Sequence, residues 1–255
     1  MDKMKIKQPH TVAITSGGRL AAGLALLLAT LTPRESSAAL TVQQAPGASS
    51  IVFEAENAHA VINGAPEIWK SIADSAASGG KGLIANGPNS TGDSPHSFAH
   101  YRLKFATPGA YYLYYRWKAD ATRTAGDVFT ANSSWIGATF GAFSTPADQA
   151  PHIRTDSNNT QAPANNTYAW RRELESIIYT VDGAQVGQPL VLTLGTREAG
   201  MVFDKFVLSS DPALAEAALE ALANSETDVV SQGAGESYGA FEAEAKARIV
   251  AGAPE

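Results

Sequence analysis

The sequence contains no cysteine, so disulfide bonds and cysteine-based metal sites are excluded. It has no excess of basic residues either, because 19 Lys and Arg are outnumbered by 25 Asp and Glu. Binding to nucleic acid depends on neutralising phosphates, so no nucleic-acid partner is expected. The apolar run LAAGLALLLATL is too short to span a bilayer. Hydrophobic residues still make up 44% of the chain, which is enough for a folded core.

The first 39 residues have the composition of a secretion signal. Basic residues precede the apolar run, and the small residues SSAAL follow it, which predicts cleavage after Ala39. An uncleaved N-terminal anchor is the alternative. Without the five basic and two acidic residues of 1–39, the chain keeps 14 basic and 23 acidic residues, a net charge of −9. We therefore expect an acidic secreted protein, extracellular or periplasmic, that is not in the membrane after cleavage.

From about Ser50 to Ser210 the pattern is one of short strands. Six segments are rich in β-branched and aromatic residues and are separated by turn residues. They are Ile51–Asn57, Tyr101–Phe105, Tyr111–Lys118, Asp127–Ala131, Pro189–Leu194 and Met201–Leu208. Helical periodicity is missing here, so we predict an all-β sandwich or barrel.

The segment PGAYYLYYRWKAD gives the clearest strand. Alternation places Tyr111, Leu113, Tyr115 and Trp117 on one face, and Tyr112, Tyr114 and Arg116 on the other. A strand this aromatic is predicted to be central and packed on both sides. The polar stretch 143–168 is predicted to be a long loop.

The sequence FEAENAHAVINGAPE at 53–67 returns as FEAEAKARIVAGAPE at 241–255, identical at eight of fifteen positions. We interpret this as a tandem repeat in a longer modular protein. The predicted domains are a signal peptide at 1–39, a sandwich at 50–210, a helical or flexible linker at 211–237, and the truncated start of a second repeat at 238–255. The linker begins with a short helix capped near Asp211.

Two glutamates, Glu54 and Glu56, lie on one face of the opening strand, with Cα atoms roughly 6.6–6.8 Å apart. Side-by-side carboxylates repel unless a positive charge lies between them, and carboxylate oxygens are preferred ligands of Ca²⁺. Asp204 is predicted to share the face of Val202, Phe206 and Leu208, where an unpaired carboxylate is costly.

These acids could also have roles that involve no metal. Glu54 and Glu56 could lie on a solvated face of an edge strand, and Asp204 could pair with a base near Lys205 or cap a loop. The two glutamates could instead be a general acid and base, as in glycosidases. No Ser/His/Asp set accompanies them, so catalysis is not expected.

Five motifs in order resemble the carbohydrate-binding modules of families 6 and 35. They are FEAE, ASGGKGL, PGAYYLYYRWKA, a tryptophan-bearing loop, and TREAGMVFDKFVLSSD, and they span about Ser50 to Asp211. The resemblance implies a jelly-roll β-sandwich with a structural calcium. It implies that Glu54, Glu56 and Asp204 bind this ion, together with a backbone carbonyl near SGGKG.

The same resemblance implies a glycan site built from aromatic residues on loops at one rim. The best matches are Trp135, Tyr168 and Trp170, and Trp69 is a further candidate, whereas Trp117 is expected in the core. Each loop tryptophan could equally fill the end of the sandwich. The long insertion 143–167 departs from the family pattern and could cover the usual cleft.

We therefore predict an exported, non-catalytic module that binds a polysaccharide or glycan and is stabilised by Ca²⁺. Tandem copies would add avidity. The alternative is a structural subunit of a filament or matrix, in which the strand at 241–255 adds to a neighbouring subunit's sheet and so drives self-association. An enzyme such as a calcium-dependent lyase is a third, less favoured class.

Overall fold

The computed structural model describes residues 40–88, 95–124, 131, 133–142, 152–154, 166–173, 177–223 and 229–231. The predicted signal peptide, the second copy at 238–255 and most of the predicted strand at 127–131 lie outside these residues. All described residues belong to one unit, 37–255.

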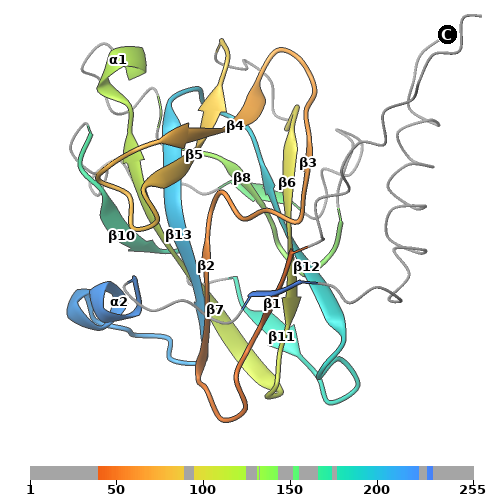
Figure 1. Cartoon of the computed structure of the whole chain (residues 1–255). Helices are drawn as coiled ribbons and strands as arrows, with labels where there is room; N and C mark the ends of the chain where they lie inside the picture. Colours follow the sequence, from red (N-terminus) through yellow and green to blue (C-terminus); the bar gives the residue numbers. More distant parts are fainter. Residues whose placement is uncertain are drawn as a thin grey trace, which may run out of the picture. The chain divides into compact units, whose positions relative to one another are not determined.

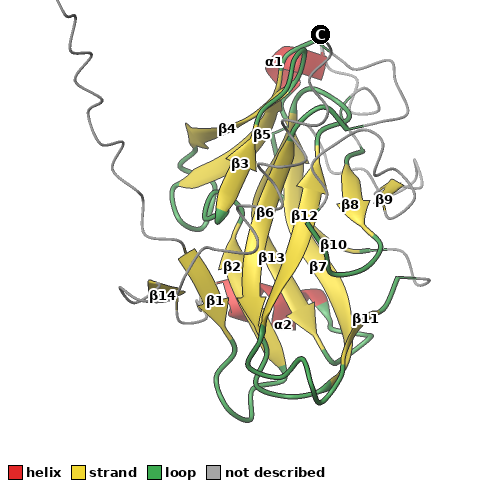
Figure 2. Cartoon of the chain, turned by 90° about the vertical axis from the view of Figure 1, so that its right-hand side faces the viewer, coloured by secondary structure: helices red, strands yellow, loops and turns green. Residues whose placement is uncertain are grey.

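The described strands form two sheets that face one another (Figures 1 and 2). The first sheet contains β1 (Leu40–Gln43), β3 (Ala60–Ile62), β6 (Phe98–Lys104), β8 (Trp135–Gly137), β9 (His152–Arg154), β12 (Pro189–Gly195) and β14 (Val229–Ser231). The second contains β2 (Ser50–Glu54), β4 (Ile68–Ala73), β5 (Lys81–Asn86), β7 (Gly109–Ala119), β10 (Ala169–Arg172), β11 (Tyr179–Val181) and β13 (Met201–Ser209). The helices are α1 (Ala121–Thr124) and α2 (Glu216–Ala223).

The strand order crosses repeatedly between the sheets. The first sheet runs β14-β1-β6-β12-β8-β9, with β3 also beside β6. The second runs β10-β7-β13-β5-β4, with β11 beside β7 and β2 beside β13. The described pairs are antiparallel except β1 with β6. The predicted all-β, jelly-roll β-sandwich is confirmed.

Aromatic rings from both sheets fill the space between them. Phe53 lies 5.1 Å from Tyr101 and 5.4 Å from Phe206, measured between ring centroids. Strand β7 contributes Tyr115 and Trp117 to this core, which leaves its alternate residues on the outer face of the second sheet. This matches the predicted alternation.

A second, smaller apolar cluster lies on the outer face of the second sheet. Leu219 of α2 packs there with Val52, Tyr114 and Val207, and each of these side chains is buried. Figure 1 shows α2 beside the strands of this sheet. Strand β7 is therefore packed on both sides, as its aromatic sequence predicted.

Strand β13 contains a β-bulge between Phe203 and Lys205 that overturns one sequence inference. We predicted that Asp204 shares a face with Phe206 and Leu208. Those two side chains instead lie in the core between the sheets, while Val207 lies in the outer cluster. A bulge inserts one extra residue and so reverses the alternation beyond it. Asp204 consequently lies with the outward-facing residues.

Segments outside the predicted boundaries, 50 and 210, also contact the two sheets. Strand β1 starts at Leu40 and pairs with β6. Beyond residue 210, α2 packs on the second sheet and β14 pairs with β1. Strand β9 lies inside the stretch predicted to be a loop. None of the helices among the described residues is long and apolar enough to cross a membrane.

Candidate functional site

Three segments that are far apart in the sequence meet at the outer face of the second sheet. They are the end of β2, the loop 74–80 between β4 and β5, and the bulge of β13. Contact between β2 and β13 continues as far as the bulge, because the Ala55 amide donates to the Asp204 carbonyl oxygen at 2.8 Å. We refer to Glu54, Glu56 and Asp204 as the acidic cluster.

Ser78 of the loop connects two members of the acidic cluster. Its amide donates to Asp204 Oδ1 at 2.8 Å. Its hydroxyl oxygen lies 3.0 Å from Glu54 Oε2 and 3.0 Å from Asp204 Oδ1. One hydroxyl proton thus faces two carboxylates, so the hydroxyl alone does not relieve their mutual repulsion.

Glu56 approaches the same loop from the turn after β2. We predicted that the strand includes Glu56, but it ends at Glu54. A Cβ added at Gly79 would lie 3.2 Å from Glu56 Oε1 and 3.4 Å from the Glu54 carboxyl carbon. Both carboxylates therefore flank Gly79, and a side chain there would crowd them. Glu56 Oε2 is buried and makes no hydrogen bond within the described part of the chain. Burial raises the pKa of Glu56, and the charge of Asp204 raises it further.

Basic side chains oppose two of the three acids. The Lys205 ammonium lies 2.7 Å from Glu54 Oε1, and both side chains are almost completely buried. Arg116 Nη1 donates to Asp204 Oδ2 at 2.5 Å. A base close to Lys205 was among the alternatives for Asp204; the partner is Arg116, and Lys205 itself pairs with Glu54.

The chemistry of the donors suits calcium, which prefers carboxylate and hydroxyl oxygens. One buried Glu56 oxygen has no partner among the residues that the structure describes, which is a further indication that a cation would be stabilised here. As the side chains lie, however, the described residues contain no group of three or more Asp, Glu or His that could hold a metal. An ion would be held by Glu54, Glu56 and Asp204, and would compete with Lys205 and Arg116 for the first and last of these.

Tyr168 belongs to a neighbouring polar network. Its hydroxyl donates to Asp74 Oδ2 at 2.9 Å, and Lys118 Nζ lies 2.5 Å from the same oxygen. Arg116 and Lys118 lie over the Tyr168 ring at 4.9 and 4.6 Å from its centroid. Burial raises the pKa of Tyr168 well above its usual value, as does its bond to Asp74. Two cations thus lie over the ring that was predicted to stack on sugar.

Trp69 was predicted as a further candidate for the glycan site, but its position in the structure contradicts that role. Its side chain is only 3% exposed and packs edge-on against Phe203, 6.1 Å between ring centroids. A ring buried between the sheets offers no face to a ligand, so Trp69 is a core residue. Trp117 is also buried, as expected.

The two remaining tryptophans are partly exposed and lie in different places. Trp170 in β10 packs against the outer apolar cluster beneath α2. Trp135 in β8 lies on the first sheet, with the Arg197 guanidinium 5.9 Å from its ring centroid. The structure therefore does not bring Trp135, Tyr168 and Trp170 together in one aromatic platform.

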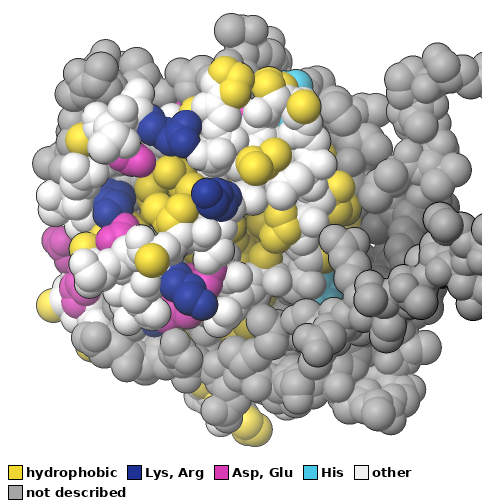
Figure 3. All heavy atoms as spheres, turned by 45° about the horizontal axis from the view of Figure 1, so that its top comes forward, with side chains coloured by type: hydrophobic (Ala, Val, Ile, Leu, Met, Phe, Trp, Pro, Cys, Tyr) yellow, Lys and Arg dark blue, Asp and Glu magenta, His cyan; other side chains and the backbone are white. Residues whose placement is uncertain are grey.

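A polar hollow of about 600 Å³ lies beside α1, lined by Gly87, Pro88, Thr122, Arg123 and Ala199. Arg123 Nη1 donates to the Gly87 carbonyl at 3.4 Å, and its other terminal nitrogen donates to the Asn86 side chain. Figure 3 views this end of the sandwich, where basic and acidic side chains surround apolar ones. The Thr122 hydroxyl donates to Asp120 Oδ1 at 2.7 Å, but the exposed Arg123 guanidinium has further N–H donors that suit a hydroxyl-rich ligand.

The segment 196–200 links this hollow to Trp135. Ala199 lines the hollow, and Glu198 Oε2 accepts a hydrogen bond of 2.9 Å from the Ser133 amide, two residues before Trp135. Thr122 and Arg123 carried no sequence signal, because they follow a predicted strand in an otherwise ordinary polar turn. We refer to Gly87, Thr122, Arg123 and Ala199 as the rim site.

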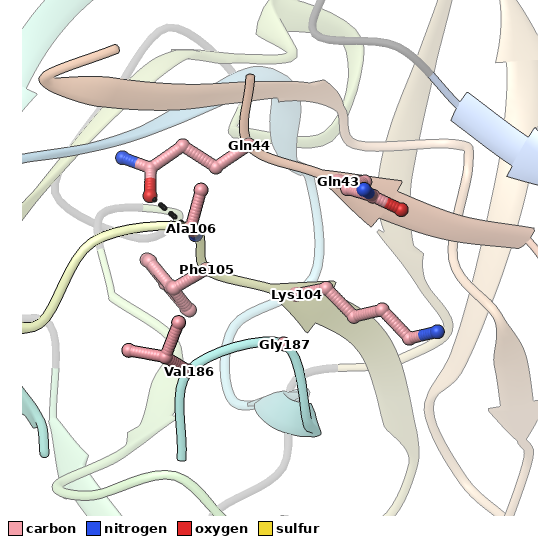
Figure 4. A pocket seen from close by; sticks show the side chains of 7 residues that line it. All are labelled: Gln43, Gln44, Lys104, Phe105, Ala106, Val186 and Gly187. Carbon is pink, nitrogen blue, oxygen red and sulfur yellow. Dashed lines mark hydrogen bonds between the residues drawn. The ribbon is translucent and has the colours of Figure 1, made fainter. Parts of the chain in front are cut away.

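A smaller cavity of about 270 Å³ lies between the ends of β1 and β6 (Figure 4). Phe105, Val186 and Gly187 are among the residues that line it. Gln44 is fully buried beside it and accepts a 2.9 Å hydrogen bond from the Ala106 amide. Its side chain is used to close this end of the sandwich and is not available to orient a sugar.

No protein-family model matches the sequence, and no curated protein matches it. Solved structures that match part of this chain include a family 35 carbohydrate-binding module from Clostridium thermocellum, at 16% identity and a TM-score of 0.38, covering 64% of this chain and 100% of the module. They also include the C-terminal family 6 module of a marine laminarinase from Zobellia galactanivorans, at 13% identity and a TM-score of 0.39, covering 63% of this chain and 98% of the module.

Larger enzymes are also among the solved structures that match part of this chain. An exo-β-1,3-galactanase from Phanerochaete chrysosporium matches at 13% identity and a TM-score of 0.40, over 63% of this chain. This chain spans only 29% of the length of that galactanase.

Proposed function

We propose that this chain is an exported, non-catalytic glycan-binding module. The observation that carries the proposal is the meeting of three motifs at one point. Glu54 of FEAE and Asp204 of MVFDKFVL both lie 3.0 Å from the hydroxyl of Ser78 in ASGGKGL. The resemblance to carbohydrate-binding modules implies that the two ends of the domain and the SGGKG segment meet, and this contact supports it.

The rim site is the proposed place of glycan binding. It combines exposed donors with a hollow of about 600 Å³, large enough for a sugar unit, and lies near the partly exposed Trp135. Hydrogen-bond donors would engage sugar hydroxyls, and the Trp135 ring would contact an apolar sugar face.

Retention on a panel of insoluble polysaccharides, followed by titration calorimetry, tests this function. We expect Arg123→Ala to weaken binding at least about tenfold, since a lost charged hydrogen bond costs about 1.5–3 kcal/mol. Trp135→Ala should also weaken binding, because the sugar loses an apolar ring face. Lys70→Ala, at an exposed residue of β4, is the control and should bind as the parent does. Binding by neither the parent nor any variant across the panel would refute the proposal.

Calcium at the acidic cluster is a separate part of the proposal. A bound ion stabilises the folded state, so the melting temperature should be higher in calcium than in EDTA. Competition from Lys205 and Arg116 argues for a modest effect, about 1–2 kcal/mol, which corresponds to roughly 2–8 °C at this length. Identical melting curves in calcium and EDTA would rule out the ion.

Self-association through a strand that adds to a sheet edge is the alternative to glycan binding. The segment Val229–Ser231, beyond α2, already pairs antiparallel with β1 of the first sheet. This pairing occupies the edge of β1, so a strand from another chain would have to displace β14 or use another edge.

A further inference from the structure

Arg116 lies between the acidic cluster and helix α2. Its Nη1 donates to Asp204 Oδ2 at 2.5 Å and lies 3.4 Å from the Ala76 carbonyl of the 74–80 loop. On its other side, Nε lies 3.6 Å from Glu220 Oε1 of α2. Nε makes no hydrogen bond within the described residues. The Arg116 guanidinium therefore contacts two acids, through a short hydrogen bond to Asp204 and a longer ion pair to Glu220.

Helix α2 is sensitive to small changes in how it is held. At eight residues it is too short to be stable alone in water, so its helicity depends on docking. Leu219 anchors it in the outer cluster, and the Tyr114 hydroxyl bonds to the preceding segment by accepting from the Leu214 amide at 3.2 Å. Any stronger attraction between Arg116 and Glu220 would therefore stabilise the docked helix.

We propose that Arg116 couples cation binding at the acidic cluster to the docking of α2. The inference rests on the calcium site proposed above. A cation bound to Asp204 competes with Arg116 for that carboxylate and repels its charge. The guanidinium then turns towards Glu220, whose carboxylate is already within reach of Nε. Cation binding and helix docking therefore strengthen each other, and the coupling is reciprocal.

Two measurements on the full chain test the coupling. Hydrogen exchange of residues 216–223 is followed in calcium and in EDTA, and calcium affinity is measured by calorimetry. In the parent chain, calcium should slow exchange in α2. In Glu220→Gln, the slowing should disappear and calcium affinity should fall about two- to fivefold, the range expected for a partly exposed ion pair.

Glu216→Gln is the matched control. It removes the same charge from the same helix, but Glu216 is exposed and Arg116 pairs with Glu220 instead. It should retain both the calcium affinity and the slowed exchange. Sodium chloride at matched ionic strength controls for screening and should not protect α2.

The possible failures are distinguishable. If calcium binds but exchange in α2 is unchanged, the coupling is wrong while the calcium site stands. The same holds if Glu220→Gln and Glu216→Gln lose affinity equally, because a general loss of negative charge then explains both. If calorimetry detects no calcium binding at all, the proposed ion and the coupling both fail, whereas glycan binding is judged separately.

Discussion

At the scale of single residues, Glu56 is the most informative side chain. Its carboxylate is part-buried, has one oxygen without a partner within the described residues, and has a raised pKa caused first by burial. An acid with a raised pKa in the folded state destabilises the protein when ionised, and the penalty disappears as the pH falls through that pKa. Without a cation, the charge of Glu56 lowers the stability of the folded state. With a cation bound, the Glu56 carboxylate would be one of its ligands.

Glu56→Gln should therefore have opposite effects under two conditions. In EDTA at neutral pH it should raise the melting temperature by a few degrees, because about 1 kcal/mol corresponds to roughly 2–4 °C at this length. In calcium, the further rise seen in the parent should be lost. The EDTA advantage should shrink as the pH is lowered and Glu56 becomes protonated. Thermal melts at several pH values check this, and equal calcium responses in parent and variant would contradict it.

Asp74 gives the reverse pH dependence. Burial acts to raise its pKa, but the hydrogen bonds from Lys118, the Ala76 amide and Tyr168 outweigh it and hold the pKa below the usual value of 3.8. An acid with a lowered pKa stabilises the fold above its unfolded pKa and loses that contribution as the pH falls through the folded value. Asp74→Asn should therefore cost about 1–2 kcal/mol at pH 7.

Melting curves between pH 7 and pH 2.5 check the prediction for Asp74. The gap between parent and Asp74→Asn should narrow as the pH falls below about 4. Asp182→Asn is a suitable comparison, because Asp182 is exposed and caps a turn through the Ala184 and Gln185 amides. A gap for Asp74→Asn that stays constant with pH would show that its charge is not what stabilises the loop.

Part of this site was predictable from the sequence. Glu54 and Asp204 were recognisable because acids inside strand patterns are costly, and they do meet at Ser78. Their ion pairs were not predictable, because the bulge at Asp204 reverses the alternation that the inference used. Lys205 is fully buried against Glu54 for the same reason. A bulge carries no reliable signal in a single sequence.

At the scale of elements, long strands were easier to predict than short ones. β7 and β13 are recognisable from their long runs of strand-forming residues. β3, β8 and β11 are three residues each, too short for a period to be recognised, and they exist because a longer neighbour offers its hydrogen bonds. Helix α2 was predicted from its Ala, Leu and Glu content, but its docking was not.

Leu219→Ala tests whether α2 belongs to the folded unit. Leu219 is 4% exposed and packs on Val52, Tyr114 and Val207. Removing its side chain should cost about 2–3 kcal/mol and lower the melting temperature by several degrees. A helix that acts only as a flexible linker would predict no change. Ala217→Ser, at an exposed position of the same helix, controls for helix propensity.

At the scale of the whole molecule, the segments outside the predicted boundaries close the sandwich. β1 extends the first sheet beside β6, and α2 covers apolar side chains of the second. A boundary drawn at 50 and 210 follows the family resemblance, which ends there. The folded unit is larger, because residues on both sides of these boundaries bury apolar side chains that the motif-bearing strands would otherwise expose.

The two candidate functions make opposite predictions for the role of the repeated sequence at 241–255. A copy of β2 could join a neighbouring sheet only at a free edge. In the described part of the chain, β2 itself is paired with β13 from Ser50 to Glu54, and the edge of β1 is occupied by β14. Displacing β2 would expose Ile51 and Phe53, which are now buried, at a cost of several kcal/mol.

We therefore expect the repeat not to drive assembly. Size-exclusion chromatography with light scattering should give the same monomeric mass for the chain after signal removal and for a version lacking 238–255. If the longer chain forms oligomers that deletion abolishes, the strand-exchange function gains its main support. Glu242→Lys and Glu244→Lys in the longer chain then separate two kinds of contact. Pairing between strand backbones tolerates these changes if the side chains face solvent, whereas a contact bridged by a cation does not.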